Sequence, residues 1–144
     1  MQNTSIITIA ATGIGLAFWP AHQGEAAGAG PFDGMWNVDS DCPDVGDVKA
    51  YDRRFPAEVS SGVVSGHYQS TTSESTGYLS GRIRPDGEAL LTVVGKTGWD
   101  PYSIGHVKPG TKIHYSANVK FDAHSGFGKR NEQRACTLTG SHAG

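Results

Sequence analysis

Histidines are the side chains in this sequence with the widest range of chemistry, and the chain has six of them. Two lie toward the ends, which leaves four for an internal site: His67, His106, His114 and His124. No two of these four are spaced two apart along a strand, and neither Cys-x-x-Cys nor His-Glu-x-x-His occurs. The sequence therefore gives no support for a zinc or haem site, and we expect no metal and no cofactor.

Other motifs that could carry chemistry also favour structural interpretations. Gly126–Arg130 is rich in glycine and basic, but it lacks the spacing of a phosphate-binding loop and predicts a glycine-bent strand. No Gly-x-Ser-x-Gly sequence is present for a hydrolase nucleophile. Four aspartates lie close together without the pattern of a calcium loop, so we expect a solvated acidic loop: Asp39, Asp41, Asp44 and Asp47.

Arg53 and His106 are the more specific signals, because each is expected on an apolar strand face. A charge that faces the interior is unfavourable unless it is paired or used. Arg53 either lies at the mouth of a barrel, or is turned outward by a bulge at Pro56, or anchors a ligand in a cavity. In the third case aromatic side chains form the walls, and the candidate ligand-binding residues are Arg53, Trp99, Tyr102, His106 and Tyr115.

The elements that position these residues are expected to be short strands joined by tight turns. Ser61-Gly62 predicts a two-residue turn that sets Val59 opposite Val64. Pro85-Asp86-Gly87 predicts a hairpin that sets Ile83 opposite Ala89. The clearest alternation of apolar and polar residues spans 112–121.

Further strands are expected where alternation continues, at 102–107 and at about 133–139. Pro56 has no N–H to donate, so its strand is an edge strand or contains a bulge. Eight or nine strands follow, with turn signals about every 8–12 residues and no convincing helix after the N-terminal segment. The predicted fold is all-β: a small antiparallel up-and-down β-barrel, or a sandwich, of about eight strands.

Composition agrees with one modest domain rich in turns. The chain has 144 residues, of which 37% are hydrophobic and 18% are charged, and 20 are glycine. The formal net charge of −2 argues against nucleic acid as a partner, since nucleic-acid binding needs a basic surface.

Residues 1–29 are expected to be an export signal that precedes a single barrel domain over residues 30–144. An uncharged apolar run, Ile6–Pro20, is followed by small residues that suit cleavage. An uncleaved membrane anchor is the alternative. No second apolar run is long enough to span a membrane. We therefore expect a periplasmic or secreted protein.

Cys42 and Cys136 are the only cysteines, and in an exported chain they favour one disulfide. Free thiols and an intermolecular bridge are the alternatives. An intramolecular bridge would join the first and last strands and favour closure into a barrel without exposed edges.

Two family resemblances bear on these expectations. Gly34-Met35-Trp36 resembles the Gly-x-Trp strand that opens lipocalin-like barrels, and this resemblance implies that Arg134, on the last strand, packs over Trp36. The chain also resembles small exported β-domain proteins of alphaproteobacteria that have no assigned activity. That likeness rests on Phe32–Trp36, the segment Leu79–Gly87 and the Cys-bearing final strand. It implies fold and export and supplies no catalytic residues.

Three functions remain open from the sequence. The first is a non-catalytic binding module for a small molecule or a partner surface. The second is a protein-interaction or inhibitor domain, acting on an envelope protein through the loops 41–47 and 96–102. The third is a barrel-type enzyme, which would require His67, His106 and Arg53 to converge in one cavity.

Overall fold

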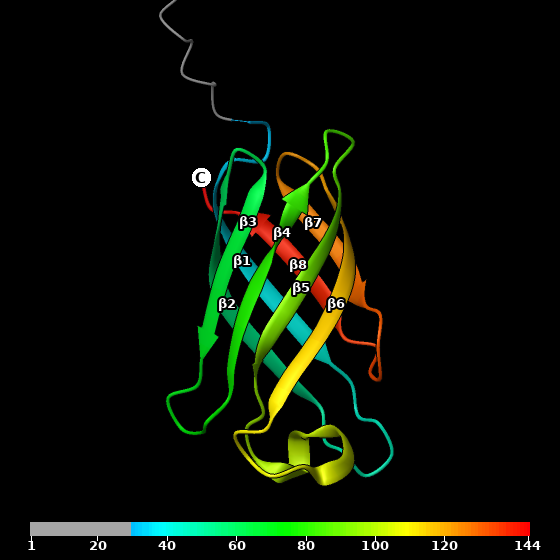
Figure 1. Cartoon of the computed structure of the whole chain (residues 1–144). Coiled ribbons are helices and arrows are strands. Elements are labelled where there is room, and N and C mark those ends of the chain that lie inside the picture. The colour runs from blue at the N-terminus through cyan, green and yellow to red at the C-terminus, as the bar shows by residue number, and fades with distance from the viewer. Residues whose placement is uncertain (1–29) are drawn as a thin grey trace, which may run out of the picture.

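A computed structural model describes residues 30–144. Eight strands form a closed antiparallel barrel in which each strand pairs with the next along the chain and β8 pairs with β1 (Figure 1). The strands are β1 Gly34–Cys42, β2 Tyr51–Ser60, β3 Val63–Gln69, β4 Thr76–Ile83, β5 Glu88–Lys96, β6 Lys112–Phe121, β7 Ser125–Arg130 and β8 Thr137–His142. Two short 3-10 helices, η1 Asp100–Tyr102 and η2 Ile104–His106, lie between β5 and β6. The predicted all-β up-and-down barrel is confirmed, whereas the expected export signal lies outside the described residues.

The hairpin registers follow the turn residues. Val59 pairs with Val64 across the Ser61-Gly62 turn, and Ile83 pairs with Ala89 across the turn at Asp86. Ser61 and Gly62 both have positive φ, as a tight two-residue turn requires. Both predicted registers are confirmed.

Side chains alternate between the core and the outer surface along every strand. In β6, Tyr115, Ala117 and Val119 are buried, while Lys120 is exposed. The three buried side chains of β6 pack the middle of the barrel together with side chains from other strands, among them Leu91, Val93 and Leu138. Two spaces among them are small, about 20 Å³ each, so this part of the described barrel is closely packed.

Trp36, near the start of β1, is buried and closes one end of the barrel. The start of β1 lies at the top of Figure 1. Trp36 Nε1 donates a hydrogen bond to the Phe32 carbonyl at 2.8 Å. The rings of Phe121 and His142 lie edge-on to it, with centroids at 5.3 and 5.2 Å. Arg134 does not pack over Trp36, so this implication of the lipocalin resemblance is wrong: His142 and Phe121 occupy that place.

Cys42 and Cys136 form a disulfide across 94 residues, which confirms the predicted bridge. Cys42 ends β1, and Cys136 immediately precedes β8. Because β1 and β8 also pair over six residue positions, from Trp36–His142 to Asp41–Thr137, the bridge and the ladder close the barrel together.

One expected strand does not form, and the last strand begins later than expected. Residues 102–107 lie in the two 3-10 helices and their connections rather than in a strand. Pro101 is the second residue of η1, and positive φ angles at Gly105 and His106 break any extended run. The last strand begins at Thr137 and not near Gln133, which has a φ of 58° within a turn. Arg134 therefore lies in a loop.

Pro56 lies in the part of β2 that has one hydrogen-bonded neighbour. The ladder to β1 runs without an extra residue through the Asn37–Pro56 pair, whereas β3 pairs only with Ala57–Ser60. Pro56 lies just beyond the last residue of β2 that pairs with β3. Both alternatives for Pro56 are therefore wrong: β2 has a paired strand on each side in the closed barrel, and its ladder to β1 has no bulge. As a result Arg53 keeps its place on the interior face of β2.

Candidate functional site: an arginine-lined cavity

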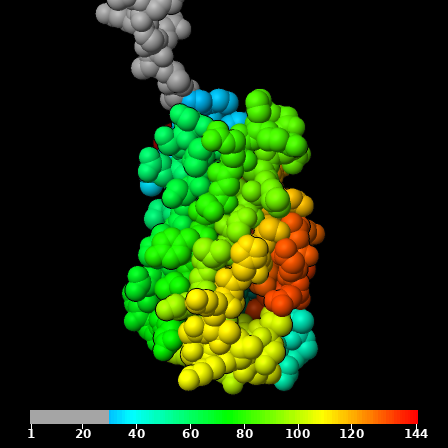
Figure 2. Space-filling model, in the orientation of Figure 1, coloured from blue at the N-terminus to red at the C-terminus, as the bar shows by residue number. Residues whose placement is uncertain are grey.

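A cavity of about 410 Å³ opens at the end of the barrel opposite Trp36. The β1–β2, β3–β4 and β5–β6 connections surround this end, at the bottom of Figure 1. Figure 2 shows the surface hollowed between the yellow residues of β6 and the orange-red segment that follows β7. The barrel is thus packed at one end and hollow at the other, and the hollow is of a size typical for small-molecule sites.

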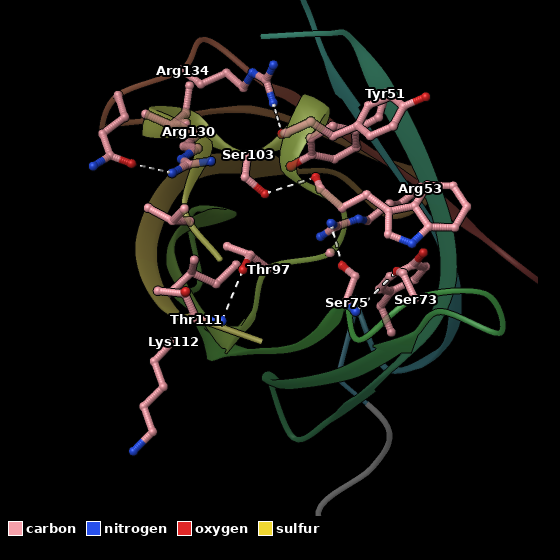
Figure 3. Close-up of a pocket in the computed structure, with 18 of the residues that line it drawn as sticks. Tyr51, Arg53, Ser73, Ser75, Thr97, Ser103, Thr111, Lys112, Arg130 and Arg134 are labelled. Carbon is pink, nitrogen blue, oxygen red and sulfur yellow. Dashed lines mark hydrogen bonds between the residues drawn. The ribbon is translucent and has the colours of Figure 1, made fainter. Parts of the chain in front are cut away.

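Arg53 projects into this cavity from β2 (Figure 3). Its Nη2 donates to Ser75 Oγ at 2.6 Å. The guanidinium lies between two aromatic rings, 4.6 Å from the Tyr51 centroid and 4.8 Å from that of Tyr68. Such cation–π contacts hold the guanidinium in place without neutralising its charge.

Arg130 enters from the end of β7, on the same interior face as Gly126 and Gly128. Its guanidinium lies 3.9 Å above the Tyr115 ring, and its Nη2 donates to Gln133 Oε1 at 3.2 Å. Its Nε is buried and has no hydrogen-bond partner among residues 30–144. Burial lowers the pKa of Arg130, because desolvation disfavours the charged form.

Arg134 is 4% exposed and joins two of the loops that surround the cavity. Its Nη1 donates to the Tyr102 carbonyl at 3.1 Å and its Nη2 to the Lys49 carbonyl at 2.8 Å. Its Nε is also buried without a partner in the described part of the chain. Arg134 therefore holds the wall of the cavity and has one donor to spare.

None of these three arginines forms an ion pair within residues 30–144, where the arginine ion pairs are Arg54–Asp39 and Arg84–Asp86. Asp52 is the one carboxylate in the lining, and it sits at an exposed position of β2. Tyr115 does not supply the missing negative charge, because burial raises its pKa. The cavity is therefore positively charged in a chain of net charge −2.

Two of the predicted aromatic residues, Trp99 and Tyr102, line the cavity together with Arg53. Trp99 is 53% exposed and Tyr102 36%, so both lie at the rim rather than inside. Tyr115 lies one layer deeper, beneath Arg130, beside a small space that it shares with Arg53.

His106 is not part of the cavity lining. Its Nδ1 lies 2.5 Å from Asp100 Oδ1 and its Nε2 lies 2.9 Å from Asp47 Oδ2. Its expected place beside Tyr115 depended on a strand over 102–107 that does not form. His106 instead links the β5–β6 connection to the acidic β1–β2 loop, and both carboxylates raise its pKa, with Asp100 the larger cause.

His67, His106 and Arg53 do not come together, whereas His114 of β6 lies in the cavity lining with Arg53. His67 stacks on Tyr78 at the outer surface of the barrel, with ring centroids 4.4 Å apart, and both residues are exposed. His106 lies outside the cavity and Arg53 inside it. These three residues cannot act on one substrate. Within residues 30–144 no group of His, Cys, Asp or Glu is arranged to hold a metal ion.

Five residues of the site were not among the ligand-binding residues predicted from the sequence: Arg130, Arg134, Tyr51, Tyr68 and Ser75. A signal existed for three of them: Tyr51 alternates with Arg53, Tyr68 is in register with Phe55, and Arg130 alternates with Gly126 and Gly128. Arg134 and Ser75 lie in irregular connections, where no periodicity indicates direction.

Comparison with protein-family models, with curated proteins and with solved structures gave no match. Within residues 30–144 no helix has the length and apolar character that crossing a membrane requires.

Proposed function

We propose that this protein is an exported, non-catalytic binding module that takes a small molecule into the arginine-lined cavity. The observation that supports this most directly is the contrast between a solid core and a hollow of about 410 Å³ at one end. Three arginines without a carboxylate partner among residues 30–144 line the hollow together with apolar side chains, and such a combination is typical of ligand sites.

Export is supported by two observations of different kinds. The chain carries an apolar N-terminal run followed by small residues, and its two cysteines form a disulfide. Disulfides persist in oxidising compartments such as the periplasm or the extracellular medium. Mass spectrometry of the exported protein should find a new N-terminus near residue 30.

Binding is tested by titrating the isotope-labelled protein with a fragment library and following amide resonances. Bound fragments should perturb the amides of Ser75, Thr97 and Ser103 and leave those of Thr139 and Gly140, at the Trp36 end, unchanged. Perturbations confined to the outer surface would refute the proposal.

A matched pair of variants separates the cavity from the rest of the barrel. Ser73 lines the cavity, whereas Ser80 is exposed on the outer face of β4. Ser73→Trp should fill the opening and abolish binding, and Ser80→Trp should leave it intact. Equal binding by both variants would place the site elsewhere.

A protein-docking role is the second candidate, favoured by exposed Trp99 and Val45 on two loops that touch. The loops are joined by the hydrogen bond from the Lys49 N–H to the Pro101 carbonyl at 2.8 Å. Pull-down from the native envelope fraction with the wild type and with Trp99→Ser distinguishes this role: a specific partner should be lost in the variant. Retention by both would refute it.

A further inference from the structure

Arg53 and Arg130 keep most of their donors free. Each uses a single nitrogen in a hydrogen bond to the described protein, Nη2 in both cases. A guanidinium carries five N–H donors in a planar fork that matches a carboxylate or phosphate. Both residues line the cavity, and neither guanidinium is paired with a carboxylate within residues 30–144.

The aromatic contacts fix these guanidiniums before any ligand arrives. Arg53 lies between Tyr51 and Tyr68, and Arg130 lies flat over Tyr115. Arginine side chains lose rotamer freedom when they bind, so holding them in advance favours association. Figure 3 shows Arg53 and Arg130 on different sides of the cavity, with Lys112 directed away from it.

A structural role alone does not account for this arrangement. Arg134, which joins loops, uses both terminal nitrogens on carbonyl groups. Arg53 and Arg130 make no comparable contacts, and Arg130 has a buried Nε without a partner among residues 30–144. Partly buried cations without a counter-ion are unfavourable, and a bound anion would offset that cost.

The lining also has an apolar part. Ile104, Val107 and Ile113 lie in it, with Trp99 at the rim. An inorganic ion would leave these side chains without contacts in a cavity of about 410 Å³. An aromatic or aliphatic body attached to the anion would cover them.

Building on the proposed function, we propose that the ligand is a small organic anion, a carboxylate or phosphate monoester with an apolar body. Its anionic group lies between the guanidiniums of Arg53 and Arg130, and its body lies against Ile104, Val107 and Trp99. Carboxylates and phosphate monoesters share this chemistry, and the experiment distinguishes them.

The test compares the affinities of acids with those of their neutral counterparts. Each probe is titrated into the full protein at low ionic strength, and binding is followed by NMR. The probes are benzoate against benzamide, indole-3-acetate against indole-3-acetamide, and phenyl phosphate against phenol, with inorganic phosphate as a further arm. At least one acid should bind about tenfold or more tightly than its neutral counterpart. The preference should weaken as salt is added. Binding of inorganic phosphate as tight as that of phenyl phosphate would overturn the organic part of the proposal.

Arginine variants inside and outside the cavity show which guanidiniums cause the preference for acids. Arg53→Gln and Arg130→Gln should each reduce it to within about threefold. Arg82→Gln, on the exposed face of β4, should leave it unchanged. Arg130→Lys keeps the charge without the planar fork and should retain part of the preference. Thermal unfolding of each variant confirms that the barrel is intact.

The outcomes separate this inference from the proposed function. Acids and amides that perturb the cavity amides with equal affinity would overturn the anion proposal and leave the binding module standing. Acid binding that survives both Arg→Gln variants would overturn it as well. If no acid perturbs the cavity amides, the anion proposal fails, and the fragment titration decides separately whether the binding module stands.

Discussion

Arg134 shows how one side chain can hold a cavity open. It is almost fully buried, and its two carbonyl contacts join the β1–β2 loop to η1. It lies two residues from Cys136, so the disulfide fixes its backbone while its guanidinium fixes the two loops. Removing the guanidinium leaves the Lys49 and Tyr102 carbonyls without these partly buried hydrogen bonds.

Arg134→Met should therefore destabilise the protein by about 1–3 kcal/mol. Arg82→Met, on the outer surface, should change the free energy of unfolding by less than about 0.5 kcal/mol. Urea unfolding of both variants measures the difference. Equal stabilities would mean that the two carbonyl contacts contribute nothing.

At the scale of elements, the connections around the cavity are held by polar contacts rather than by a core. The β5–β6 connection is tied to the β1–β2 loop by His106–Asp47 and by the Lys49 to Pro101 hydrogen bond. The first contact depends on the charge of His106. Because Asp100 and Asp47 raise the pKa of His106, the protonated form is favoured in the folded state.

The contact between the β1–β2 loop and the β5–β6 connection should therefore weaken as the pH rises. A pKa raised on folding means that the contact is fully present below the unfolded pKa of about 6.5 and is lost as pH rises through the folded pKa. The protection factor of the Lys49 amide, corrected for intrinsic exchange, should fall as the pH rises above about 6.5 and through the raised pKa of His106. His106→Gln should remove that fall, and Asp47→Asn should lower the His106 titration midpoint. An unchanged midpoint would show that Asp47 does not pair with His106 in solution.

At the scale of the whole molecule, closure depends on joining the two ends of the chain. β1 and β8 are far apart in sequence, pair directly, and are linked by the disulfide across 94 residues. A bridge of this length strongly restricts the unfolded chain. It also fixes the end of β1 beside the cavity loops.

Replacing both cysteines by serine should lower the free energy of unfolding by about 4 kcal/mol. Urea unfolding of the oxidised protein, the reduced protein and the double variant measures this effect. The reduced protein and the variant should agree with each other. Coincident transitions for the oxidised and reduced forms would show that the ladder alone closes the barrel.

Local information in the sequence was enough to specify most of the barrel. Period-two alternation indicates which face of β6 is buried, and Ser61-Gly62 and Asp86-Gly87 set hairpin registers because only certain turns join twisted strands. The same local logic failed at residues 102–107. Alternation there is accidental, and Pro101 together with positive φ at Gly105 and His106 determines a turn.

By itself, then, the sequence determined the strand faces, the hairpins and the disulfide, since each depends on neighbours in the chain or on the count of cysteines. It left the direction of Arg53 open, because a bulge at Pro56 would have turned that side chain outward, and the unbroken ladder between β1 and β2 decided it. Only the tertiary structure decided that Arg53, Arg130 and Arg134 share one cavity, and that His106 lies outside it. The physical reason is that the sheet closes into a barrel. Pairing β8 with β1 curves the sheet so that residues from β2, β7 and the following loop face each other, a relation that no local pattern contains.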